Sequence, residues 1–147
     1  MSETREVRFS TLVRAEPGIV FDALATAEGL DRWFTRGGST LEPGPGGALV
    51  FRYKNWGVED FTGEMVGEVV EHHRPERFSF RWPVDSGGYM TTVAVDFEPH
   101  EDGTVVTLVE GVYEDDATGL QDMLNRSSGW AQALILMKFW VEHGVTY

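Results

Sequence analysis

The sequence predicts an α+β fold in which a curved antiparallel sheet wraps around one long C-terminal helix, with two short helices after the first strand. The stretch Leu120–Glu142 has no proline and carries apolar residues at the i, i+4, i+7 spacing of an amphipathic helix. Before it, successive segments alternate apolar and polar residues and are joined by short turns, which favours antiparallel pairing. A helix of that length needs a large apolar surface. We expect the sheet to supply it, with a pocket between the two.

Length and composition predict a single domain over residues 1–147. The chain is 41% hydrophobic and 12% aromatic, and a domain of this size buries about 68–70% of its unfolded surface. It contains no cysteine, which excludes disulfides and thiolate metal sites. Met1–Arg14 has no charged-then-apolar leader, and no apolar run is long enough to cross a bilayer. We therefore expect a cytoplasmic protein without membrane insertion.

The charge balance is acidic. Lys and Arg number 12 against 24 Asp and Glu, the formal net charge is −12, and the basic residues do not cluster. Nucleic-acid binders need a basic face, so we expect no nucleic-acid partner. The acidity by itself is typical of a well-solvated surface.

The N-terminal part is predicted to form one strand and two short helices. Glu6–Ala15 is rich in β-branched and apolar residues, as strands are. Pro17–Ala25 begins with a proline, which the first turn of a helix tolerates, and carries an apolar side. Ala27–Phe34 places Leu30 and Trp33 at i and i+3, which is typical of a second short helix.

Alternating patterns predict the strands that follow. Gly44–Gly47 is a turn rather than a phosphate-binding loop, because a strand and not a helix follows it. Gly63 and Gly67 are expected to mark a bulge or a sharp bend within a strand. The predicted strands are Ala48–Lys54, Phe61–His72, Phe78–Trp82, Thr91–Glu98 and Thr104–Tyr113.

The long helix has start signals and an apolar face. Asp115, Asp116 and Thr118 precede it and provide N-cap side chains and charges that suit the helix dipole. The predicted inner face is centred on Leu134 and consists of residues at helical spacing: Met123, Ser127, Trp130, Met137 and Val141.

Several segments together resemble the START-like (SRPBCC) superfamily, and within it the branch named for the activator of heat-shock protein 90 ATPase. Pro17–Leu24 and Leu30–Phe34 are similar to its opening. Gly67–Glu71 and Pro75–Trp82 are similar to its central strands, and Gly129 with Trp130 to its final helix. The similarity covers nearly the whole chain in order.

This resemblance implies a helix-grip fold, in which the sheet holds the long helix around a hydrophobic cavity. Members of the superfamily bind lipids, polyketides and other apolar small molecules, and some are cyclases or hydrolases. The namesake co-chaperone has an additional N-terminal domain that this sequence does not contain, which argues against a role on that chaperone.

The inward faces of the strands and the helix predict a ligand site. Tyr53, Trp82, Val95 and Leu108 should point toward the long helix. Apolar cavities with a few polar groups are typical ligand sites. The alternative is that these side chains simply fill the interior. The predicted ligand-binding residues are Trp33, Tyr53, Trp82, Val95, Leu108, Glu110, Arg126, Trp130, Leu134 and Met137.

Glu110 is the polar residue most in need of an explanation. It continues the inward parity of Val106 and Leu108, and a carboxyl group on an inner face is costly without a partner. One interpretation is a ligand anchor, or, in an enzyme, a general acid or base with a raised pKa. The others are a place at the open rim in water or a pair with Arg126.

Metal-dependent and nucleophilic catalysis are not expected. His72 and His73 are adjacent and point to opposite faces of a strand, and the chain has no HExxH or His-x-His pattern. We predict no metal site and no cofactor. Ser127 and Ser128 precede Gly129 without the Gly-x-Ser-x-Gly elbow of serine hydrolases.

A second apolar cluster lies on the far side of the long helix. Ile135, Leu136 and Phe139 stand away from the Leu134 stripe, where members of the resembled family usually have polar residues. Exposed apolar clusters mark partner surfaces. We predict a homodimer through this face, with cover by the N-terminal segment as the alternative.

These observations favour a protein that binds a small apolar molecule without converting it. Glu110, with Tyr53 or Arg126, would orient the ligand. The second hypothesis is a cyclase- or hydrolase-type enzyme that uses the same cavity, with Glu110 as acid or base. The third is a protein-interaction or co-chaperone-like module that acts through its acidic surface or through Ile135 and Phe139.

Overall fold

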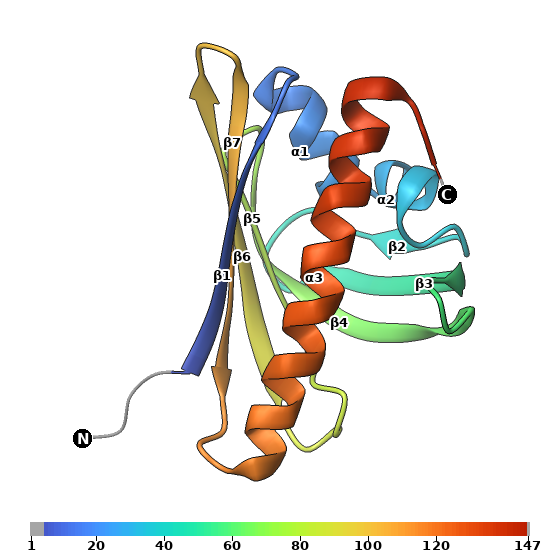
Figure 1. The fold of residues 1–147 in the computed structure, drawn as a ribbon, viewed down its shortest axis with the longest axis vertical. Coiled ribbons are helices and arrows are strands. Elements are labelled where there is room, and N and C mark those ends of the chain that lie inside the picture. Colours follow the sequence, from blue (N-terminus) through green and yellow to red (C-terminus); the bar gives the residue numbers. More distant parts are fainter. Residues whose placement is uncertain (1–4, 147) are drawn as a thin grey trace.

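One twisted antiparallel sheet and a long helix dominate the computed structural model, which describes residues 5–146 (Figure 1). The other residues of the predicted 1–147 domain, including the start of Met1–Arg14, lie outside the described part. The strands follow the order β1-β7-β6-β5-β4-β3-β2 across the sheet. The elements are β1 (Arg5–Val13), α1 (Pro17–Ala25), α2 (Ala27–Trp33), β2 (Thr40–Leu41), β3 (Ala48–Trp56), β4 (Phe61–His73), β5 (Arg77–Pro83), β6 (Met90–His100), β7 (Gly103–Tyr113) and α3 (Ala117–His143).

This architecture confirms the predicted α+β fold and its element order. All neighbouring strands are antiparallel, and α3 crosses the concave side of the sheet (Figure 1). The short strand β2 was not predicted, since a two-residue strand carries no alternation. None of the described helices is long and apolar enough to cross a membrane.

The bulges lie beside the predicted glycines rather than at them. The β3–β4 register shifts between Tyr53 and Trp56, and the β4–β5 register shifts between Val69 and Glu71. Gly67 instead allows two strands to approach closely, because a Cβ at this position would lie 2.2 Å from the carbonyl oxygen of Arg81.

Thr26 connects the two short helices. Its backbone ends α1, and its hydroxyl accepts a hydrogen bond of 2.9 Å from the backbone N–H of Gly29 in α2. This is the arrangement expected of an N-cap threonine. A buried side chain also joins the two helices, because the indole of Trp33 in α2 donates a hydrogen bond of 2.8 Å to the carbonyl of Ala23 in α1.

The long helix starts earlier than predicted, and Trp130, Leu134 and Met137 of its predicted inner face are buried. Asp116 is the N-cap and accepts a hydrogen bond of 2.6 Å from the backbone N–H of Gly119. Predicted inner residues Met123, Ser127 and Val141 are only half buried. The fully buried set includes polar residues with partners on the sheet, which hydrophobic spacing does not detect: Gly119, Asp122, Arg126, Trp130, Ala133, Leu134 and Met137.

The core is rich in aromatic side chains and lies between α3, the two short helices and the concave side of the sheet. Here α3 packs chiefly against β1 and β7, at one side of the sheet. The largest fully buried side chains include Trp33, Phe21, Phe51, Phe78, Phe80, Leu108 and Met137.

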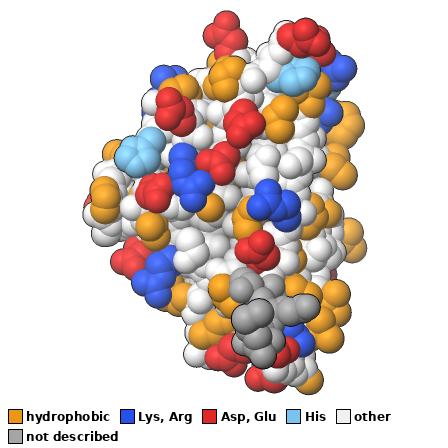
Figure 2. All heavy atoms as spheres, turned by 90° about the vertical axis from the view of Figure 1, so that its left-hand side faces the viewer, with side chains coloured by type: hydrophobic (Ala, Val, Ile, Leu, Met, Phe, Trp, Pro, Cys, Tyr) orange, Lys and Arg blue, Asp and Glu red, His pale blue; other side chains and the backbone are white. Residues whose placement is uncertain are grey.

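The opposite face of the sheet carries ion pairs between neighbouring strands. Arg77 of β5 contacts Glu71 of β4 at 2.7 Å and Asp96 of β6 at 2.8 Å. Arg81 contacts Glu68 at 3.1 Å. Acidic and basic side chains are interspersed on the side of the molecule shown in Figure 2. The excess of acidic residues is thus distributed rather than gathered in one patch on this side.

An ion pair joins α1 to the turn between β4 and β5. Arg74 donates two hydrogen bonds to the carboxylate of Asp22, of 2.8 and 2.9 Å. Hydrogen bonding by the Arg74 guanidinium, together with its charge, lowers the pKa of Asp22 below the ordinary value of 3.8. Both side chains are about half exposed, so the net stabilisation is small.

We expect Asp22→Asn to lower the free energy of unfolding at pH 7 by less than about 1 kcal/mol. A lowered pKa in the folded state gives stability above the unfolded value, which is lost as the pH falls through the folded value. The unfolding curves of the variant and the parent protein in urea should therefore converge as the pH drops below 3.8. A difference that persists unchanged at that acidity would contradict this assignment.

Candidate functional site

A cavity of ≈ 540 Å³ lies between the β3–β4 hairpin and the first half of α3. The helix α3 packs against β1 and β7, at one end of the strand order. It therefore leaves room on the same face of the sheet near β3 and β4, which extend beyond it. Phe34, directly after α2, forms part of the wall. Six of the lining residues are aromatic: Phe34, Tyr53, Trp56, Phe61, Trp82 and Trp130.

The aromatic rings contact one another around Phe34. Its ring centroid lies 4.9 Å from that of Trp56 and 5.2 Å from that of Tyr53, both in edge-to-face geometry. The rings of Trp82 and Trp130 are 5.6 Å apart. Such pairs stabilise each other beyond the area they bury. The wall of the cavity is therefore held in place by its own contacts.

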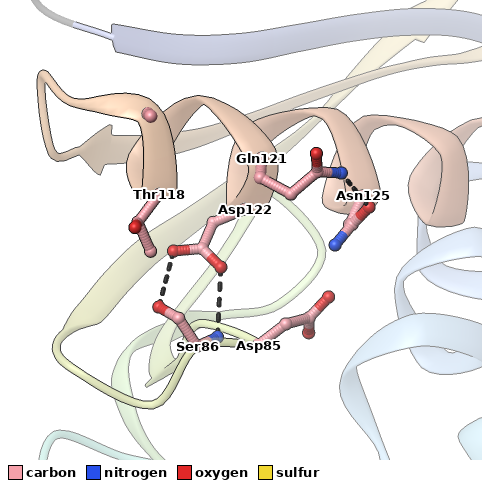
Figure 3. A pocket seen from close by; sticks show the side chains of 7 residues that line it. Asp85, Ser86, Thr118, Gln121, Asp122 and Asn125 are labelled. Carbon is pink, nitrogen blue, oxygen red and sulfur yellow. Dashed lines mark hydrogen bonds between the residues drawn. The ribbon is translucent and has the colours of Figure 1, made fainter.

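A second, shallower pocket of ≈ 440 Å³ lies at the start of α3 (Figure 3). Six of its seven lining residues are polar. Asp122 is already engaged there, because it accepts hydrogen bonds from the backbone N–H and the hydroxyl of Ser86, of 3.1 and 2.7 Å. Asp85 and Asn125 line both pockets, so the two adjoin. The aromatic cavity is the better candidate site, since ligand sites are mostly apolar and enclosed.

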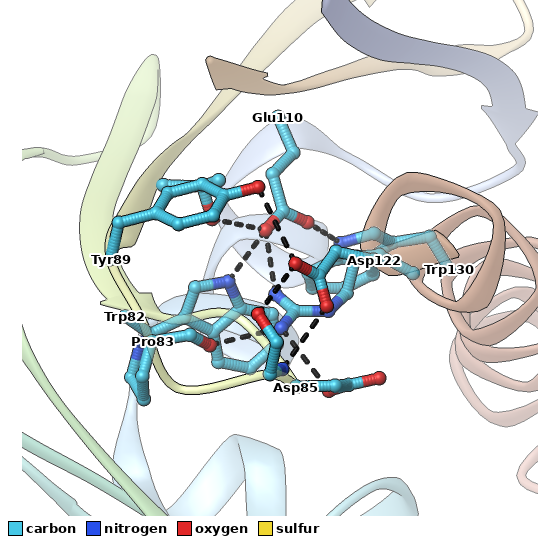
Figure 4. A network of polar contacts seen from close by, with 10 residues as sticks. Trp82, Pro83, Asp85, Tyr89, Glu110, Asp122 and Trp130 are labelled. Atoms are coloured by element: carbon cyan, nitrogen blue, oxygen red, sulfur yellow. Dashed lines mark hydrogen bonds and ion pairs between the residues drawn. The ribbon is translucent and has the colours of Figure 1, made fainter. Parts of the chain in front are cut away.

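Glu110 of β7 is the centre of a buried polar network beneath the cavity (Figure 4). Its carboxylate is fully buried. Its Oε2 accepts hydrogen bonds from the Trp82 indole at 2.8 Å, the Thr91 hydroxyl at 2.5 Å and the Arg126 guanidinium at 2.6 Å. Its Oε1 accepts one from the Trp130 indole at 2.7 Å. A buried carboxylate needs this compensation.

Arg126 connects the network to the turn after β5. Its guanidinium donates a hydrogen bond of 3.0 Å to the carbonyl of Pro83 and lies 3.5 Å from the carboxylate of Asp85. It also lies over the ring of Trp82, 4.3 Å from the centroid, at a distance typical of cation–π contacts. The network thus joins β5, β6 and β7 to α3.

Tyr113 adds a second buried polar group near Glu110. Its hydroxyl is buried and has no hydrogen-bond partner among the described residues. Burial raises the pKa of Tyr113 well above its ordinary value, and the charge of Glu110 raises it further. The phenol therefore stays protonated across the physiological range.

The structure divides the predicted ligand-binding residues into three groups. Tyr53, Trp82, Arg126 and Trp130 line the cavity. Glu110 lies behind three of them, and the predicted pair with Arg126 is present. The others are buried in the core and do not line the cavity: Trp33, Val95, Leu108, Leu134 and Met137.

Sequence reasoning missed part of the wall for a specific reason. Strict alternation from Tyr53 places Asn55 on the inner face and Trp56 outside. The bulge between Tyr53 and Trp56 reverses this parity and brings Trp56 to the cavity. The other missed lining residues are Phe34 directly after α2, Asp85 in the turn after β5, and residues of the hairpin and α3: Gly57, Val58, Glu59, Phe61, Met65, Asn125, Ser128, Gly129 and Gln132.

The predicted dimer face is partly exposed. Ile135 is 57% and Phe139 is 51% exposed. Leu136, which was predicted to belong to this face, is half buried and packs against the core. Leu120 and Leu124 extend the exposed apolar stripe toward the start of α3.

A family model described as Activator of Hsp90 ATPase homolog 1-like protein matches residues 14–141. The chain belongs to this family. The match confirms the resemblance carried by Pro17–Leu24 and Pro75–Trp82, and it includes both the cavity and the Glu110 network. No protein of curated function has a significant sequence match to this family member.

Solved structures share the fold of this family member over nearly its whole length. Protein SSP2350 from Staphylococcus saprophyticus is 24% identical, with a TM-score of 0.75 over 97% of this chain and 96% of that one. CalU16 from Micromonospora echinospora is 17% identical, with a TM-score of 0.75 over 97% and 78%. The Aha1 dimer from Colwellia psychrerythraea is 19% identical, with a TM-score of 0.75 over 95% and 98%. These similarities establish the fold alone.

We expect Glu110→Gln to lower the free energy of unfolding by about 3–5 kcal/mol, because it leaves the buried Arg126 without its charged partner. The matched control is Glu68→Gln, which removes the half-exposed pair with Arg81 and should cost less than about 1 kcal/mol. Urea denaturation at neutral pH measures both. Equal losses in the two variants would show that the Glu110 network does not stabilise the fold.

Proposed function

We propose that the protein binds a small, mainly apolar molecule in the cavity between the β3–β4 hairpin and α3. The observation that carries this proposal is the ring of six aromatic side chains around a cavity of ≈ 540 Å³. The volume lies within the usual range for ligand sites. The wall is formed by the β3–β4 hairpin, α3 and Phe34, so the space has a defined lining.

Burial of apolar ligand surface would provide the driving force. Each 100 Å² of apolar surface removed from water contributes about 2.5 kcal/mol before the costs of association. Contacts between the aromatic rings hold much of the wall in place without a ligand, so little ordering is needed on binding. This favours a cavity that is formed in advance.

The polar groups of the lining would orient the ligand. Arg126 and the Tyr53 side chain lie in the wall, and Asn125, Ser128 and Gln132 of α3 contribute short polar side chains. Glu110 acts behind them as a positioning residue, since it holds Arg126, Trp82 and Trp130 by hydrogen bonds.

Binding without conversion is favoured over catalysis by the environment of Glu110. A general base must reach the proton that it removes. Oε2 of Glu110 already accepts three hydrogen bonds and Oε1 accepts one, and neither oxygen is exposed. Glu110, the residue that a cyclase- or hydrolase-type mechanism would use, therefore has a structural role.

A homodimer through α3 is the second proposal, and it is favoured by the exposure of Ile135 and Phe139. Leu120 and Leu124 lengthen the same stripe, so a partner helix could bury four large apolar side chains. The Colwellia psychrerythraea relative has been determined as a dimer.

Filling the cavity should weaken binding without harming the fold. Gly129 lines the cavity, and a Cβ at this position would meet no atom within 4 Å. We expect Gly129→Leu to weaken binding of the neutral fluorescent probe N-phenyl-1-naphthylamine at least tenfold. The melting temperature should not fall, because glycine inside a helix is unfavourable by about 1 kcal/mol.

Gln121→Leu is the matched control, because it changes the shallow pocket of Figure 3 instead. Its probe affinity should equal that of the parent protein. Unchanged affinity in Gly129→Leu, or a loss confined to Gln121→Leu, would place binding outside the aromatic cavity.

The dimer is tested by light scattering after size exclusion. The parent protein should have twice the monomer mass at micromolar concentration, and Phe139→Glu should convert it to a monomer because it places a charge in the apolar stripe. Val66→Glu is the control, since Val66 is similarly exposed but belongs to β4 and not to the apolar stripe of α3. A parent protein of monomer mass would rule the dimer out.

A further inference from the structure

The charged residues that line the cavity are mostly acidic. Among the described residues that line it, Glu59 and Asp85 are acidic and Arg126 is basic. Glu59 and Asp85 are both exposed, so they belong to the part of the lining that solvent reaches, here called the mouth. The balance of charge therefore depends on whether the guanidinium of Arg126 is available to a ligand.

Arg126 is already compensated. Its guanidinium lies 2.6 Å from Glu110, which is fully buried, and 3.5 Å from Asp85. The guanidinium also donates a hydrogen bond of 3.0 Å to the carbonyl of Pro83. The Arg126–Glu110 pair is neutral as a unit, so the net charge that a ligand meets is that of the carboxylates at the mouth.

The aromatic wall has the same electrostatic preference. The faces of Trp, Tyr and Phe rings carry negative potential, and they attract cations within about 6 Å of the ring centroid. Six such rings line the cavity, and the face of one of them, Trp82, is already covered by the Arg126 guanidinium at 4.3 Å. Aromatic walls together with nearby carboxylates form the usual environment of bound ammonium groups. A carboxylate or phosphate ligand would instead meet repulsion at the mouth.

We propose that the ligand is an organic cation, with an amine or quaternary ammonium group on an apolar body. This inference rests on the proposed function and narrows its ligand class. The apolar body occupies the aromatic cavity, and the charged group lies near Glu59 and Asp85. The formal net charge of −12 favours the approach of cations and disfavours that of anions.

Three probes with one apolar body, a phenylbutyl group, test the charge preference: 4-phenylbutyltrimethylammonium, 4-phenylbutanol and 5-phenylpentanoate. Calorimetric titration at neutral pH and low salt should give the ammonium probe an affinity about tenfold above that of the alcohol. The pentanoate should bind most weakly.

The double variant Glu59→Gln, Asp85→Asn should reduce the preference for the ammonium probe over the alcohol to less than threefold. The control Glu101→Gln, Asp102→Asn removes the same charge from the β6–β7 turn, outside the cavity. Its preference should stay at the parent value, which separates a local effect of the mouth from an effect of net charge.

The two proposals fail in different ways. Equal affinity for the ammonium probe and the alcohol, tighter binding of the pentanoate, or equal effects of the two double variants would overturn the cation inference. If N-phenyl-1-naphthylamine still binds, the proposed function stands. If neither that probe nor any of the three phenylbutyl probes binds, both proposals are wrong.

Discussion

The buried pair of Glu110 and Arg126 is the interaction on which the arrangement of the site depends. A carboxylate with no exposed surface is tolerated only when its charge and its lone pairs are satisfied. Here the donors come from β5, β6 and α3. Because two of them are the indoles of Trp82 and Trp130, the same contacts that satisfy Glu110 also set two rings of the cavity wall.

The position of α3 explains why the cavity is where it is. The helix packs chiefly against β1 and β7, and the space beneath its second half is filled by residues such as Met137 and Leu134. The strands β3 and β4 extend past the helix on the side away from β1 (Figure 1). The remaining space is lined by the aromatic side chains of the hairpin, with Phe34 closing it from α2.

Family membership establishes the scaffold, whereas the site decides what the scaffold does. Relatives at 17–24% identity share the fold over most of its length, so little of the sequence is required for the sheet and the helix. The side chains around the cavity are the part of this chain that can distinguish one ligand from another. Their aromatic and acidic character is the basis of both ligand proposals.

The sequence by itself determined the α+β class, the order of the elements and the family, because local periodicity, turn residues and cap residues are short-range signals. It also indicated Glu110 as an inward carboxylate and Tyr53, Trp82 and Trp130 as inward aromatics. Only the tertiary structure decided that Glu110 supports the wall, that Val95 and Leu108 belong to the core, and that Trp56 enters the cavity. These outcomes depend on a strand bulge, on the lateral position of α3 and on contacts between residues far apart in the chain, which spacing along the sequence does not encode.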